Sequence, residues 1–61
     1  MQTRISFDLP DSEAIALAQL VKRIGYAEMR TNAVSDEECE VMVQAIYKLQ
    51  DALAQAGFSP R

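Results

Sequence analysis

The chain has 61 residues, a formal net charge of −3, 49% apolar residues and 25% charged residues. These values are typical of one small globular domain, and they exclude both a disordered chain and a protein that binds nucleic-acid phosphates through excess positive charge. A single cysteine excludes an internal disulfide, and the absence of histidine from the sequence removes the commonest catalytic base and metal ligand.

Residues 3–9 (TRISFDL) alternate between polar and apolar side chains. Ile5, Phe7 and Leu9 share one face, and the residues between them share the other. This period of two predicts a β-strand with one buried face, which Pro10 ends. No second strand is predicted in the chain, so this strand either pairs with a second copy or lies as an extended arm along the helices.

Residues 12–24 are predicted to form a helix that Asp11 or Ser12 caps. Its apolar stripe comprises Ala14, Leu17, Leu20, Val21 and Ile24. Gly25 is expected to end the helix in the left-handed conformation.

Residues 25–34 form a corner whose conformation the sequence leaves open. Tyr26 and Met29 follow helical spacing, whereas Thr31 and Asn32 favour a break. We interpret Tyr26 and Met29 as side chains that close the end of the core.

Residues 36–56 are predicted to form the longest helix. Ser35 and Glu38 match a capping box, Gly57 supplies the left-handed residue after the helix, and Phe58 completes a Schellman motif. Pro60 prevents a restart, and residues 57–61 form a tail that frays at its end. An apolar row with alternating spacings of three and four comprises Cys39, Met42, Ile46, Leu49, Leu53 and Ala56. This row is interpreted as a core face against the first helix, with a dimer seam as the alternative.

The predicted fold is therefore mainly α with a minor β component. A single domain, residues 1–61, comprises an N-terminal β-strand followed by a two-helix antiparallel hairpin. A chain of this length buries only about 60% of its unfolded surface, so a homodimer is a reasonable source of further buried area.

No catalytic, cofactor or metal constellation is found in the sequence, and we predict a protein that is not an enzyme and needs no cofactor. Cys39 is expected to act as a small buried apolar side chain. The chain shows neither a signal segment nor a run of eighteen apolar residues, so a cytoplasmic location without a membrane partner is expected.

The segment RISFDLPDSEAIALAQLV resembles the ribbon-helix-helix repressors, which pair two strands in a dimer and place this ribbon in the major groove. The resemblance implies base contacts by Arg4, Ser6 and Asp8. An aspartate at such a position repels phosphate, and the connection over residues 25–35 is longer than the tight turn of that family. Direct DNA binding is therefore not expected.

The segments KRIGYAEMRTNAVSDEE and ALAQAGFSPR resemble a family of short uncharacterised bacterial proteins, some of which phages and other mobile elements carry. The family has no established activity, so the resemblance implies no site residues. It does imply that the corner is a structural unit, in which we expect either an Arg30–Asp36 or an Arg23–Glu28 ion pair.

The function predicted from these features is that of a small acidic interaction module. We expect it to dock on a larger protein with a basic surface. A phage inhibitor of the anti-CRISPR type, which blocks a nucleic-acid-binding site, is the expected class of such a protein. The residues expected to bind the partner are Asp8, Asp11, Glu13, Asp36, Glu37, Glu38 and Glu40. The alternative is a dimeric ribbon-helix-helix regulator or an antitoxin.

Overall fold

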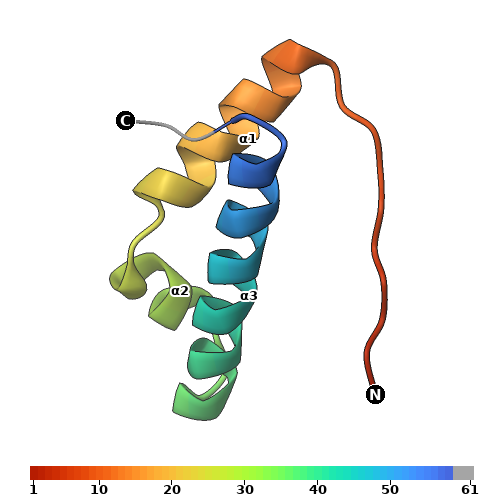
Figure 1. The fold of residues 1–61 in the computed structure, drawn as a ribbon. Coiled ribbons are helices and arrows are strands. Elements are labelled where there is room, and N and C mark those ends of the chain that lie inside the picture. Colours follow the sequence, from red (N-terminus) through yellow and green to blue (C-terminus); the bar gives the residue numbers. More distant parts are fainter. Residues whose placement is uncertain (59–61) are drawn as a thin grey trace.

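The computed structural model describes residues 1–58, which contain three helices: α1 (Asp11–Arg23), α2 (Tyr26–Asn32) and α3 (Asp36–Gln55). The long helix α3 contacts both of the others, with α2 beside its N-terminal half and α1 across its C-terminal half (Figure 1). The helices α1 and α3 form the predicted helical hairpin, and α2 is inserted in the chain between them. None of the helices in residues 1–58 is long and apolar enough to cross a membrane.

The predicted β-strand at residues 3–9 is wrong. Residues 1–58 contain no strand, so the minor β component of the predicted fold is absent and the chain is mainly α. Residues 1–10 instead form an extended arm that leaves α1 and runs back along α3 (Figure 1). No backbone N–H group of residues 1–9 donates a hydrogen bond within the described chain. Alternation favours extended backbone, but a strand also requires a hydrogen-bonded neighbour, and residues 1–58 provide none.

The helix α1 begins one residue earlier than predicted, and its expected side-chain cap is wrong. Pro10 occupies the N-cap position, and its carbonyl oxygen accepts hydrogen bonds from the N–H groups of Glu13 and Ala14, each at 3.0 Å. Neither Asp11 nor Ser12 caps the helix, because both already lie inside its first turn. Proline is tolerated at this position because the φ of −57° lies within its fixed range and the N–H group that it lacks would have no partner within the helix.

Gly25 begins α2 and does not end α1 in the predicted left-handed conformation. It has φ −103° and ψ 174°, and its N–H donates to Oε2 of Glu28 at 3.0 Å. The carboxylate of Glu28 therefore caps the start of α2. The corner that the sequence left open is a two-turn helix whose Thr31 hydroxyl and Asn32 amide donate to backbone carbonyls one turn earlier.

The end of α3 is a Schellman motif, as predicted. Gly57 has φ +96°, its N–H donates to the carbonyl oxygen of Ala54 at 3.0 Å, and the N–H of Phe58 donates to that of Leu53 at 2.8 Å. Pro60, with the fraying predicted for the tail, lies outside the described residues.

The core is small and lies between α1 and α3. Ala18, Val21 and Leu53 are its buried members, and Leu17, Ile46, Leu49 and Phe58 pack against them. The side-chain amide of Gln50 donates to the carbonyl oxygen of Val21 at 2.8 Å and satisfies a carbonyl at the end of α1. In the apolar row of α3, Cys39 and Leu53 are buried as the core-face interpretation requires, whereas Ala56 is exposed.

Candidate functional site

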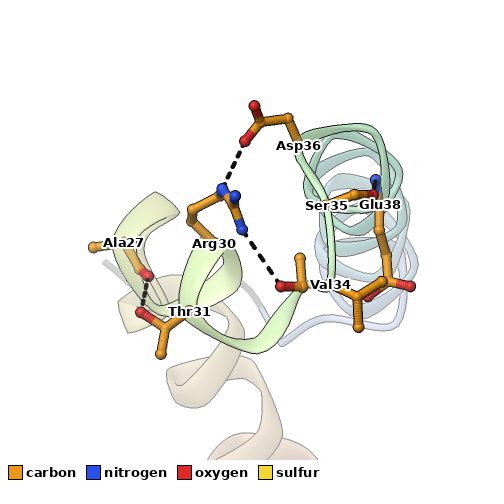
Figure 2. Close-up of polar contacts among 8 residues, drawn as sticks. Ala27, Arg30, Thr31, Val34, Ser35, Asp36 and Glu38 are labelled. Carbon is orange, nitrogen blue, oxygen red and sulfur yellow. Dashed lines mark hydrogen bonds and ion pairs between the residues drawn. The ribbon is translucent and has the colours of Figure 1, made fainter.

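The corner between α2 and α3 is held by Arg30. Its Nε lies 2.6 Å from Oδ1 of Asp36, which confirms the first of the two predicted ion pairs, and its Nη1 donates to the carbonyl oxygen of Ala33 at 3.4 Å (Figure 2). Glu28, which the second predicted ion pair joined to Arg23, caps Gly25 instead. Arg30 thus joins the end of α2 to the start of α3, and Asp36 stabilises this corner as its ion-pair partner.

The capping of α3 engages a second carboxylate. Oγ of Ser35 accepts a hydrogen bond from the N–H of Glu38 at 3.1 Å, as the capping box predicts. The carboxylate of Glu38 reaches one residue further back than in the standard motif, to the N–H of Val34 at 3.1 Å. Of the four acidic residues at this helix start, Glu37 and Glu40 make no hydrogen bond or ion pair within residues 1–58 and are available to a partner.

Glu37 and Glu40 border an open depression of about 620 Å³ on the surface shared by α2 and α3. We call this the Tyr26 surface; its residues are Tyr26, Glu37, Glu40, Val41, Val43 and Gln44. Tyr26 is 60% exposed and Val41 is 68% exposed. An aromatic and an aliphatic side chain beside two carboxylates form an apolar centre with a negative border, which is the usual anatomy of a protein interface.

Tyr26 interacts with the buried thiol at the start of α3. The pKa of its phenol is raised above the ordinary value, mainly by hydrogen bonding with the Cys39 side chain, then by the electrostatic effect of Cys39 and by desolvation. Asp36 raises it further and Arg30 opposes the shift. The phenol therefore stays neutral at physiological pH, when it can act as a hydrogen-bond donor.

Cys39 is fully buried and unpaired, as expected for a small apolar side chain. Within residues 1–58 no cluster of acidic residues and cysteine could hold a metal ion.

The seven acidic residues predicted to bind a partner fall into two groups. Asp36, Glu37, Glu38 and Glu40 lie at the start of α3. Asp8, Asp11 and Glu13 lie in the arm and at the start of α1, at the other end of the molecule (Figure 1). The two groups are separated because the helices of the hairpin run in opposite directions. The structure therefore does not bring all seven residues into one patch.

Sequence reasoning missed the apolar part of the Tyr26 surface. Met29 is 9% exposed and closes the core as predicted, but the same prediction for Tyr26 is wrong. The exposure of Val41 could have been predicted, because Val41 lies outside the apolar row of α3 and has no predicted core partner. The exposure of Tyr26 was harder to predict, because its orientation depends on where α2 begins.

Comparison with known proteins identifies the family of the chain. A model of a family of unknown function, DUF7706, matches residues 1–61, and the chain belongs to that family. The expected membership of an uncharacterised family is confirmed at this level. No curated protein and no solved structure matches the chain significantly.

Proposed function

We propose that this member of the DUF7706 family is a non-enzymatic interaction module that docks on a basic surface of a larger protein through the Tyr26 surface. The observation that carries the proposal is the pairing of exposed Tyr26 and Val41 with the carboxylates of Glu37 and Glu40. Tyrosine is enriched at the centres of interfaces because its ring buries a large area at a low cost in conformational entropy.

The charge of the surface indicates the chemistry of the partner. The net charge of the chain is −3, and Glu37 and Glu40 are left uncompensated while Asp36 and Glu38 serve the fold. A lysine- or arginine-rich surface with an apolar pocket for Tyr26 would complement this arrangement, and electrostatic attraction would accelerate association. Binding should therefore weaken as the salt concentration rises.

The proposed partner class can be narrowed further. Basic surfaces of large proteins commonly bind nucleic acids, so the chain would act as an inhibitor by occupying such a site. A phage or mobile-element origin and an anti-CRISPR type of action stay predictions from the sequence.

The experiment compares the proteins that immobilised variants retain from a bacterial extract. Glu40→Lys and Tyr26→Ala should lose a partner that the wild-type chain retains, whereas Glu13→Lys, a matched charge change at the start of α1, should retain it. Retention of the same partner by all variants would contradict the proposal that the Tyr26 surface is the docking surface. Once the partner is identified, loss of its nucleic-acid binding on addition of the chain would establish inhibition, and unchanged binding would exclude it.

A further inference from the structure

The chain exposes more surface than a compact protein of its size. Its accessible surface is 5210 Å², whereas about 4,000 Å² is expected for a folded chain of 6.8 kDa. Its radius of gyration is 12.5 Å, against about 10.5 Å expected for 61 residues. The excess surface, on the order of 1,000 Å², exceeds the roughly 800 Å² that one partner contributes to a standard interface. The single chain thus leaves an interface-sized area uncovered.

The arm (residues 1–10) contributes exposed apolar side chains to this uncovered area. Ile5 is 79% exposed and Phe7 is 61% exposed, although they share an apolar face with Leu9. The arm forms one wall of an open groove of about 360 Å³, and Leu17 of α1 with Leu49 and Ala52 of α3 line the opposite side. Ile5 and Phe7 stay exposed although they line the groove, so a second segment that is extended and apolar on one face would cover them.

The arm itself has the properties of that segment, and its charges select one arrangement. When two arms lie antiparallel with Ser6 opposite Ser6 of the second copy, Arg4 of each arm faces Asp8 of the other. In the same register, Ile5 faces Phe7 on the apolar side. If Ile5 or Phe7 lay at the centre of the antiparallel pair instead of Ser6, Arg4 would no longer lie opposite Asp8. Opposite charges directly across an antiparallel pair are stabilising, and like charges are destabilising.

We propose that the occupant of the groove is a second copy of this chain, whose arm lies antiparallel to the first with the twofold axis at Ser6. No backbone N–H group of residues 1–9 donates within residues 1–58, and in an antiparallel pair every second one would donate across the axis, while the two apolar faces cover both grooves. Pro10 ends the contact because it has no N–H group to donate.

This contact is independent of the Tyr26 surface. The arm and α2 lie on opposite sides of α3 (Figure 1), and the residues that line the groove are not shared with the Tyr26 surface. A dimer would therefore present two Tyr26 surfaces, and each proposal can fail without the other.

A charge exchange tests the register. Sedimentation equilibrium of the wild-type chain should give a mass near twice 6.8 kDa at high concentration. Arg4→Asp and Asp8→Arg alone should each weaken the dimer about tenfold, because each places like charges opposite one another at two symmetric positions. The double variant, Arg4→Asp with Asp8→Arg, should restore wild-type affinity. A wild-type chain that stays monomeric at submillimolar concentration, or a double variant no tighter than the single ones, would overturn the proposal.

Cross-linking provides a second measurement of the same geometry. Ser6→Cys places two thiols across the axis at a separation that a disulfide can span, so mild oxidation should give a covalent dimer. Ser12→Cys, at the exposed start of α1, is the matched control and should stay monomeric. Equal cross-linking of both variants would overturn the proposal. Helicity measured by circular dichroism should be unchanged throughout, because Arg4, Ser6 and Asp8 lie outside the helices and Ser12 is an exposed residue of the first turn of α1.

Discussion

Replacing Gly57 with alanine should destabilise the protein through backbone strain alone. Gly57 has φ +96°, and an added Cβ would meet no atom within 4 Å, so no steric clash contributes. The left-handed conformation costs an L-residue about 1–2 kcal/mol, and the lower entropy of the unfolded alanine chain offsets about 0.4–1 kcal/mol of this. The expected net loss is about 1 kcal/mol, which lowers the Tm of a domain of this size by about 4–8 °C.

Gly25→Ala is the matched control. Its φ of −103° suits any residue, but the new Cβ would lie 2.8 Å from Oε2 of Glu28. Glu28 can swing away because its far end is exposed and flexible, so the chain loses one exposed hydrogen bond to Gly25. That loss of about 0.5–1 kcal/mol is offset by a similar entropic gain, and a change near zero is expected.

Thermal unfolding followed by circular dichroism at 222 nm compares the two variants directly. Gly57→Asn should recover part of the loss of Gly57→Ala, because asparagine tolerates the left-handed region better than alanine does. The reasoning would be refuted if Gly57→Ala were as stable as the wild type, or if Gly25→Ala were the more destabilising change. The first result would mean that the left-handed residue contributes nothing at the end of α3, and the second that the contact between Gly25 and Glu28 contributes more than the strain at Gly57.

Three further predictions concern the cap, the core and the phenol. Ser35→Ala should cost about 1 kcal/mol in a urea titration, whereas Ser12→Ala, which removes no cap, should cost little. Leu53→Ala should cost about 2–5 kcal/mol and leave much of the chain unfolded at 37 °C, and wild-type stability would contradict the assigned core. Tyr26 should titrate above the ordinary tyrosine pKa when followed at 295 nm, and Cys39→Ala should lower that midpoint. Because the folded state holds this proton more tightly, stability should fall as the pH rises past the ordinary tyrosine value.

The ends of α3 could be predicted from the sequence alone. Ser35 and Glu38 at its start and Gly57 with Phe58 at its end act through hydrogen bonds between residues at most five apart. Such interactions depend on the local backbone and not on the rest of the fold, so the side chains themselves determine them. The interior face of α1 was predictable only in part from helical spacing, because Ala14 and Val21 are buried as predicted, whereas Leu20 is exposed and the buried Ala18 was not in the predicted stripe.

Tertiary structure decided the rest. Gly25 is an exception: it was expected to end one helix and instead begins the next, although its capping hydrogen bond to Glu28 joins residues only three apart and is therefore local. The exposure of Tyr26 depends on how α2 packs on α3, which local spacing does not determine. The same holds for the two acidic groups, which lie at opposite ends because α1 and α3 are antiparallel.

The arm shows most clearly which features the local sequence determines and which depend on tertiary structure. The alternation of residues 3–9 determined an extended backbone, and the structure confirms that conformation while it removes the strand. A helix satisfies its backbone hydrogen bonds within its own segment, whereas a strand requires a neighbour from elsewhere. The sequence of a segment can therefore specify a helix by itself, but only the arrangement of the whole chain decides whether an extended segment has a partner.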